Sequence, residues 1–384
     1  MNNRIYLDNA ATTRMSEAVW QAMEPWLKEQ YGNPSSIHGT GREAQKAIHK
    51  ARCRAAEAIG AEPREILFTS GGSESDNWAL KGYAFAHRGE GNHIITSSVE
   101  HHAVLHTCGW LEKQGFRVTY LPVDGEGRVS PEDVEKAITD ETILISIMAA
   151  NNEIGTIEPV SEIGEIAGRR GIAFHTDAVQ AAGAVPLSVR DLKADMMSLS
   201  AHKFHGPKGT GILYIRNGTV IQNLIHGGAQ ERGLRAGTEN TAGIAGTGEA
   251  IARCAEGIPE RNRRIAEMRD FLLNGILRTI PDTCLNGPRE NRLPGNCHVS
   301  FRGIEGEALL LRLDMAGIAA SGGSACTSGS PEPSHVMQAI GADAERIKGS
   351  IRFSLSDETT KEELDEVLRV LPQIVGQLRS LRGT

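Results

Sequence analysis

Between residues 65 and 215, short apolar runs alternate with segments whose apolar residues recur at helical spacing. Each run has the length and composition of a buried strand. Strands that alternate with helices favour an α/β fold built on a mostly parallel, doubly wound sheet. In such sheets, ligands bind beyond the carboxyl ends of the strands. The predicted strands are 65–69, 94–97, 118–121, 142–147, 173–176, 196–199 and 211–215.

The alternation of predicted strands and helices ends after residue 215. In addition, a chain of 384 residues is long for a single hydrophobic core. We therefore predict a larger α/β domain over 16–258 and a smaller α+β domain that combines 1–15 with 259–384. Further predicted elements are the helices 17–28 (after the capping residue Ser16), 42–59, 243–280 and 360–379, and the strands 296–301 and 350–354.

The charge pattern excludes several classes of protein. The net charge is -7 and no concentrated basic tract occurs, which argues against direct binding of nucleic acid or of a membrane surface. The first residues lack the apolar core of a signal peptide, and no apolar run approaches the length of a membrane-spanning helix. We expect a soluble, cytoplasmic protein.

The cysteines do not form a recognisable framework. None is part of a Cys-x-x-Cys pair or of a histidine spacing typical of zinc, so we expect no metal site. In a chain of this size without an export signal, reduced thiols are expected rather than disulfides. The six cysteines are Cys53, Cys108, Cys254, Cys284, Cys297 and Cys326.

Lys203 has unusual neighbours for a lysine, which is ordinarily a solvated surface residue. It follows the end of a predicted strand and precedes a glycine-rich turn, within residues 200–211. Upstream, the predicted strand 173–176 leads into Asp177 and Gln180. A lysine held near an aspartate suits Schiff-base chemistry on a phosphorylated pyridine cofactor.

Other polar residues also follow predicted strands. The turn 70–77 joins a strand to a helix and could bind an anion at the helix N-terminus, although an ordinary loop with a serine cap fits equally well. It is neither a Walker motif nor a dinucleotide-binding motif. The carboxyl ends of parallel strands meet at one edge of a sheet. The candidates at these ends are Ser73, His101, Asn152, Asp177, Gln180 and Lys203.

Two later segments are less decisive. The glycine-rich segment 227–240 contains two arginines and Thr238, which could reach a phosphate or a carboxylate, or it could be a surface connection. Cys326 lies in a run of Ser, Gly and Pro over 321–333, outside any core pattern. An accessible loop favours a reactive thiol over a structural one.

Together these segments resemble the cysteine desulfurases of the NifS/IscS type. The resemblance runs from the N-terminus to about residue 382, and several separate motifs agree in order. It implies a homodimeric enzyme that depends on pyridoxal 5'-phosphate (PLP) and has fold type I, as in aspartate aminotransferase. The motifs lie at 6–13, 69–77, 99–101, 151–155, 175–180, 200–211, 235–240 and 324–328.

The resemblance also implies individual roles. Lys203 would hold PLP and move the α-proton, Asp177 would pair with the pyridine nitrogen, and His101 would stack on the ring and take part in proton transfer. Arg352 would bind the substrate carboxylate, and Cys326 would be the nucleophile that accepts sulfur. The remaining cofactor contacts would come from Gly72, Ser73, Ser200 and His202 at the phosphate with Thr238 of the partner subunit, Gln180 at the ring hydroxyl, and Asn152 beside the ring and substrate.

The implied reaction converts L-cysteine to L-alanine and an enzyme-bound persulfide on Cys326. The sulfur would serve iron–sulfur cluster assembly or related sulfur transfer, through a scaffold or other acceptor protein that the sequence does not identify. A selenocysteine lyase, another PLP enzyme of this fold, and an inactive scaffold are the alternatives. Ser73, Ala229 and Gly322 differ from the residues common in relatives.

Overall fold

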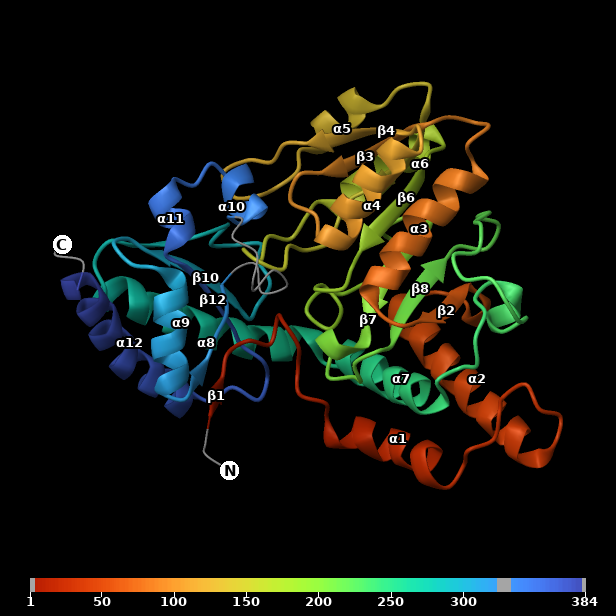
Figure 1. Ribbon diagram of the computed structural model, residues 1–384, viewed down its shortest axis with the longest axis horizontal. Helices are drawn as coiled ribbons and strands as arrows, with labels where there is room; N and C mark the ends of the chain where they lie inside the picture. Colours follow the sequence, from red (N-terminus) through yellow and green to blue (C-terminus); the bar gives the residue numbers. More distant parts are fainter. Residues whose placement is uncertain (1–3, 323–332, 382–384) are drawn as a thin grey trace.

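The computed structural model describes residues 4–322 and 333–381, and its centre is a seven-stranded sheet (Figure 1). The strand order is β2-β8-β7-β6-β5-β3-β4. Neighbouring strands from β7 to β4 pair in parallel, whereas β8 is antiparallel to both β2 and β7. The strands are β2 (Ile66–Thr69), β3 (His93–Ser97), β4 (Arg117–Leu121), β5 (Thr142–Ser146), β6 (Ala173–Asp177), β7 (Met196–Ser200) and β8 (Gly211–Ile215).

The mostly parallel sheet predicted from the sequence is therefore confirmed, and each predicted strand forms within one or two residues of its expected bounds. Adjacent residues of a strand face opposite sides of the sheet, so that Leu144 and Ile145 enter two different apolar clusters. Helices cover both faces, as a doubly wound fold requires. They are α1 (Glu17–Lys28), α2 (Gly39–Ile59), α3 (Gly72–Ala86), α4 (His102–Lys113), α5 (Pro131–Ala137), α6 (Val160–Arg170) and α7 (Thr241–Ala255).

Ser16 caps α1 as predicted, since its side chain accepts a hydrogen bond from the backbone of Val19 at 3.4 Å. The segment expected to be helical over 243–280 forms two helices, α7 and α8 (Ile258–Thr279). Gly257, in the left-handed region at φ 58°, lies between them. Left-handed backbone cannot continue an α-helix, so the chain turns at this glycine.

A second, three-stranded sheet lies in the C-terminal part of the chain. In it, β10 pairs antiparallel with both β12 and β9. A separate two-stranded sheet is formed by β1 from the N-terminus, which pairs in parallel with β11. The elements are β1 (Ile5–Tyr6), β9 (Thr283–Leu285), β10 (Asn296–Phe301), α9 (Gly306–Met315), β11 (Ile318–Ala319), α10 (His335–Ala339), α11 (Ala344–Lys348), β12 (Ser350–Ser354) and α12 (Lys361–Leu381).

Leu7 packs with β10, β12, α8 and α12 in an apolar cluster that is separate from those of the central sheet. This cluster explains why an N-terminal strand joins residues more than three hundred positions later. It supports the predicted division into a domain over 16–258 and a domain that combines 1–15 with 259–384. That division stays a prediction.

The small sheet has one apolar and one polar face. Cys297, Val299 and Phe353 pack in its core, whereas His298 and Arg352 lie opposite each other on the other face. His298 is fully buried, and within the described part of the chain neither of its ring nitrogens has a hydrogen-bond partner. Burial, with Arg352 and other arginines nearby, lowers the pKa of His298 to about 3.

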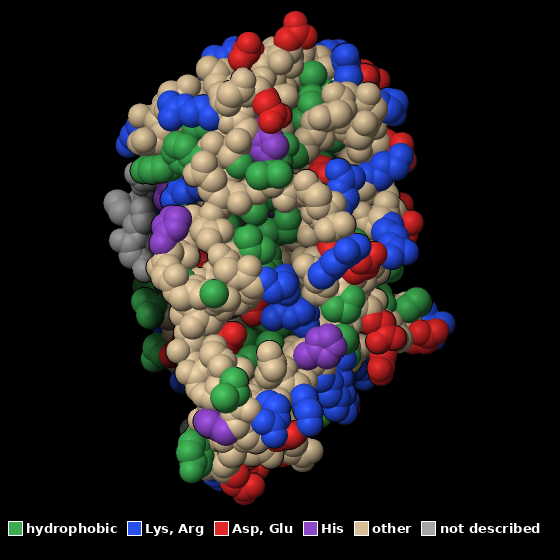
Figure 2. Space-filling view, turned by 90° about the vertical axis from the view of Figure 1, so that its right-hand side faces the viewer, with side chains coloured by type: hydrophobic (Ala, Val, Ile, Leu, Met, Phe, Trp, Pro, Cys, Tyr) green, Lys and Arg blue, Asp and Glu red, His purple; other side chains and the backbone are tan. Residues whose placement is uncertain are grey.

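The surface carries charges of both signs. On the face that Figure 2 shows, Lys and Arg side chains lie interspersed with Asp and Glu side chains. Among the described residues, no helix combines the length and the apolar character needed to cross a membrane.

A buried ion pair joins α2 to the loop before α7. Arg52 donates from both terminal nitrogens to Glu231, at 2.8 and 2.7 Å, and from Nη1 to the Ile66 carbonyl at 2.5 Å. Glu231 also accepts from the backbone of Phe68 at 3.2 Å. The side chains of Arg52 and Glu231 are only 11% and 3% exposed, so this pair is shielded from solvent.

We expect Arg52→Met to lower the free energy of unfolding by about 3 to 5 kcal/mol, because it leaves the Glu231 carboxylate buried without its cation. Urea denaturation measures the change. Lys46→Met on the same helix is the control, since Lys46 and Glu43 form an exposed pair whose loss costs less than about 1 kcal/mol. Equal losses for the two variants would show that the buried pair does not anchor the loop.

His298→Leu tests the burial of a neutral imidazole. In the unfolded chain this histidine takes up a proton below about pH 6.5, whereas the folded protein resists protonation down to about pH 3. Acidification therefore favours unfolding of the wild type by up to about 1.4 kcal/mol per pH unit in this window. The variant lacks this penalty, so its stability relative to wild type should increase as the pH falls. A stability difference that is independent of pH would contradict the assignment.

Candidate active site

A cavity of about 180 Å³ lies at the carboxyl edge of the central sheet, next to β12. It lies beyond the ends of β3, β5, β6 and β7, as expected for a doubly wound sheet. The sequence-predicted residues that line it are Gly72, Ser73, His101, Asn152, Asp177, Gln180, Ser200, His202, Lys203 and Arg352.

Two predicted site residues are not among them. Thr238 is exposed and does not line the cavity of its own chain. Cys326 lies outside the described residues.

Asp177 is the last residue of β6 and is 5% exposed. Its carboxylate accepts a hydrogen bond from the backbone of Val179 at 2.9 Å. Asp76, from the first half of α3, is also buried, and oxygen atoms of the two carboxyl groups lie within 4.8 Å of each other and of a ring nitrogen of His101. Burial raises the pKa of both aspartates. The neighbouring Asp177 carboxylate raises the pKa of Asp76 further, so the ionisation of one carboxyl group disfavours the ionisation of the other.

His101 caps the N-terminus of α4. Its Nδ1 accepts from the backbone of Ala103 at 3.1 Å, which leaves Nε2 to carry the hydrogen of the neutral ring. Burial, together with the nearby Lys203, lowers the pKa of His101 to about 4. The ring is therefore neutral at pH 7 and can donate or accept a proton in the cavity.

Lys203 ends a short 3-10 helix (Ala201–Lys203) that directly follows β7. Its Nζ donates to the carbonyls of Ala10 and Ala11, at 2.6 and 2.9 Å, and the side chain of Gln180 donates to the Ala10 carbonyl at 2.9 Å. The N-terminal segment 8–13 therefore forms one wall of the cavity.

The N-terminus of α3 offers an anion site. The N-cap residue, Gly71, has a backbone conformation (φ 152°, ψ -177°) that side-chain-bearing residues rarely adopt, and no side chain caps the helix. A Cβ on Gly72 would lie 2.7 Å from a methyl carbon of Val179, so this position leaves room only for glycine. The absence of a serine cap favours the anion-binding interpretation of this turn over an ordinary capped loop. Ser73, Ser200 and His202 add polar groups to the same cavity.

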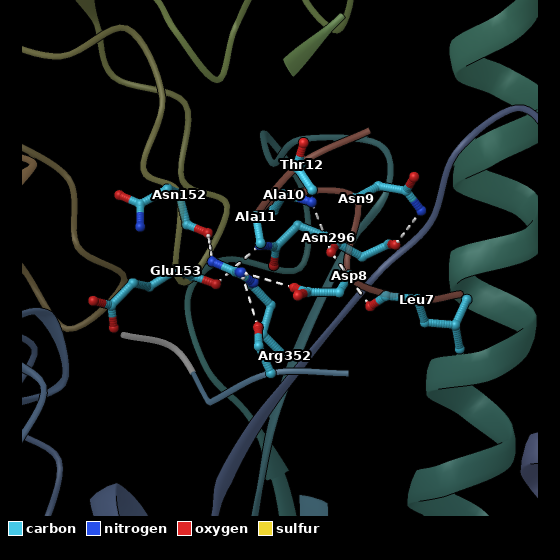
Figure 3. Close-up of polar contacts among 12 residues, drawn as sticks. Leu7, Asp8, Asn9, Ala10, Ala11, Thr12, Asn152, Glu153, Asn296 and Arg352 are labelled. Carbon is cyan, nitrogen blue, oxygen red and sulfur yellow. Dashed lines mark hydrogen bonds and ion pairs between the residues drawn. The ribbon is translucent and has the colours of Figure 1, made fainter. Parts of the chain in front are cut away.

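Arg352 lies on β12 and is 1% exposed (Figure 3). Its Nη1 donates to the backbone carbonyl of Asn152 at 2.8 Å. Its Nη2 donates to the Ser321 hydroxyl at 2.9 Å and to the Asp8 carboxylate at 3.2 Å. These contacts fix the guanidinium group at the edge of the cavity, where it can bind a carboxylate.

Several lining residues were not predicted from the sequence. Asp76 carried a signal, because it is a carboxylate one turn after the glycine turn of a predicted strand–turn–helix unit. Ala10 and Ala11 belong to a segment that was noted for its resemblance but given no role. Their contribution comes from backbone carbonyls, which no side-chain pattern marks. The unpredicted lining residues are Ala10, Ala11, Asp76, Met148, Ala150 and Val179.

Comparisons with known proteins agree with this geometry. The aminotransferase class-V family profile matches residues 5–367. A cysteine desulfurase IscS from Methanosarcina thermophila is 58% identical over 380 residues, which cover 99% of this chain and 94% of the relative. A solved NifS-like protein has a TM-score of 0.92 and 42% identity, over 98% of this chain and 100% of that one. Another, SspA in complex with cysteine, has a TM-score of 0.82 and 39% identity, over 93% and 100% of the two chains.

These matches confirm the resemblance noted in the sequence, because they extend over nearly the whole chain at high identity. The chain belongs to the class-V aminotransferase family and, within it, to the cysteine desulfurases of the IscS and NifS type.

Proposed function

We propose that the protein converts L-cysteine to L-alanine with PLP as cofactor, and leaves the sulfur on Cys326 as a persulfide. The observation that carries this proposal is the arrangement of Lys203, Asp177, Arg352 and the N-terminus of α3 around one cavity. A solved relative with 39% identity was determined in complex with cysteine, which supports the choice of substrate.

The residues present fit PLP. A phosphate suits the uncapped N-terminus of α3, where Ser73, Ser200 and His202 lie nearby. A protonated ring nitrogen suits the buried Asp177, since its carboxylate needs a positive partner. Lys203 would bind the aldehyde carbon, Gln180 the ring hydroxyl, and Asn152 would lie beside the ring. When bound, PLP accepts electrons from the α-carbon of an amino acid.

The side chains around this group have separate tasks. Arg352 binds the substrate carboxylate and so orients the amino acid. Asp177 would keep a proton on the ring nitrogen by charge pairing. Lys203 moves the α-proton, and the neutral His101 donates or accepts protons at the opposite side of the reacting atoms.

Sulfur transfer balances without an external oxidant. The Cys326 thiolate attacks the sulfur of the substrate, an S–S bond forms, and the Cβ–S bond breaks. The electron pair of that bond passes to Cβ, which gains a proton, so that L-cysteine and one thiol give L-alanine and one persulfide.

The described ends of the Cys326 segment support this role. Ser321 hydrogen-bonds Arg352, while Ser334 donates to Glu153 at 2.5 Å and the His335 ring contacts the Glu100 carbonyl at 3.0 Å. Cys326 follows Ser321 by only five residues, a span of at most about 17 Å of chain. Chain connectivity alone therefore limits how far Cys326 can lie from Ser321, which contacts the proposed carboxylate-binding group.

The assembly and the destination of the sulfur belong to the same proposal. We place Thr238 in the site of the partner subunit of a homodimer, since it is exposed in its own chain and the segment around it is glycine-rich. The persulfide passes to an iron–sulfur scaffold or another acceptor protein. The cytoplasmic location stays a prediction.

Release of sulfide and L-alanine from L-cysteine, with a reductant present, tests the reaction. Cys326→Ala should lower sulfide release by about 100-fold or more, as loss of a covalent nucleophile does. The visible absorbance of the bound cofactor should remain. Cys284→Ala is the matched control, because Cys284 lies on β9, outside the cavity, and this variant should keep wild-type turnover.

Undiminished sulfide release by Cys326→Ala would contradict the persulfide mechanism and favour a lyase that expels its leaving group without a protein nucleophile. A wild-type protein that never acquires the visible absorbance of the cofactor would favour the inactive scaffold.

A further inference from the structure

Asp8, the first residue of the N-terminal segment 8–13, has no assigned role, yet it contacts the proposed carboxylate-binding group. The Asp8 carboxylate lies 3.2 Å from Nη2 of Arg352. The side chains of the two residues are 21% and 2% exposed, so water screens their attraction only in part. Figure 3 shows Asp8 and Asn152 on different sides of the guanidinium group.

Asp8 is held in place by its backbone and its neighbours. It forms a parallel bridge with Ser354, whose carbonyl accepts from the Asn9 side chain at 2.9 Å. The Ser354 hydroxyl accepts from the backbone of Ala10, also at 2.9 Å. The carboxylate of Asp8 is therefore a fixed negative charge beside Arg352.

Arg352 lines the cavity, whereas Asp8 does not. An α-carboxylate that enters the cavity therefore approaches a guanidinium group that already contacts the Asp8 carboxylate. The Asp8 carboxylate and the α-carboxylate are both attracted to the guanidinium group and repel each other. Each therefore weakens the binding of the other. A neutral acceptor such as the Ser321 hydroxyl does not have this effect.

We propose that Asp8 is a resident counterion of Arg352 that weakens the binding of α-carboxylates and so sets the affinity of the site for amino acids. This inference rests on the proposed function, because it takes Arg352 as the carboxylate-binding group. It adds a residue that adjusts affinity without touching the reacting atoms.

Weaker binding of α-carboxylates suits the proposed reaction, because the product must leave the site. The substrate L-cysteine and the product L-alanine carry the same α-carboxylate, so a clamp that holds one tightly also holds the other. Binding energy that is equal for substrate, transition state and product lowers KM without raising kcat. A partly neutralised arginine orients the substrate and still releases the product.

Asp8→Asn tests the proposal, because its amide oxygen can still accept from Nη2 while the charge is removed. The dissociation constant for L-alanine, read from the visible spectrum of the holoenzyme, should fall by about 10-fold, the size of one charge-assisted hydrogen bond. The KM for L-cysteine should fall with it, while kcat stays equal or decreases. Binding of ethylamine, which has no carboxylate, should not change.

Ser321→Ala is the matched control, since it removes a neutral partner of the same nitrogen atom. It should not tighten the binding of L-alanine. If Asp8→Asn does not fold, Asp8→Ser removes the same charge with a smaller side chain and carries the same expectation.

Unchanged or weaker binding of L-alanine by a folded Asp8 variant would overturn the counterion proposal. Arg352→Gln separates this failure from that of the proposed function. If Arg352→Gln weakens the binding of L-alanine but not that of ethylamine, Arg352 binds the carboxylate. Only the role proposed for Asp8 is then wrong. If Arg352→Gln weakens the binding of neither compound, Arg352 does not bind the α-carboxylate. The role proposed for Arg352 and the counterion role proposed for Asp8 are then both wrong.

Discussion

A buried guanidinium group determines how the distant parts of this chain meet. Arg352 is almost fully buried, and a charge in such a place must be paired and hydrogen-bonded. Its partners among the described residues include the Asp8 carboxylate from the N-terminus, the Asn152 carbonyl from beyond β5, and the Ser321 hydroxyl. Satisfying this one group therefore brings the N-terminal segment, the central sheet and the small sheet together at the site.

Burial also determines the charge states of other groups in the cavity. His101 is neutral because burial and Lys203 disfavour its protonated form, and burial raises the pKa of both Asp177 and Asp76. The described part of the site thus combines the cationic side chains of Arg352 and Lys203 with the buried Asp177 and Asp76 and an anion site at α3. This distribution matches a zwitterionic amino acid beside a phosphorylated, ring-protonated cofactor.

Sequence patterns predicted the central sheet well, because buried parallel strands such as 142–147 are apolar throughout and separated by amphipathic helices. They did not predict β9 or β11, which are only two or three residues long and depend on partners distant in the sequence. The cavity residues could be found because they follow strands, and their specific roles came from the family resemblance. Asp8 escaped notice, since its significance lies in a contact with a residue 344 positions away.

The roles of the individual site residues depend on Lys203 being the attachment point of the cofactor. Borohydride reduction of the PLP-loaded protein, followed by peptide mapping with mass spectrometry, measures this directly. The reduced cofactor should be found on the peptide that contains Lys203 and nowhere else. Attachment to another lysine, or no attachment at all, would contradict the assignment of the cavity as the active site.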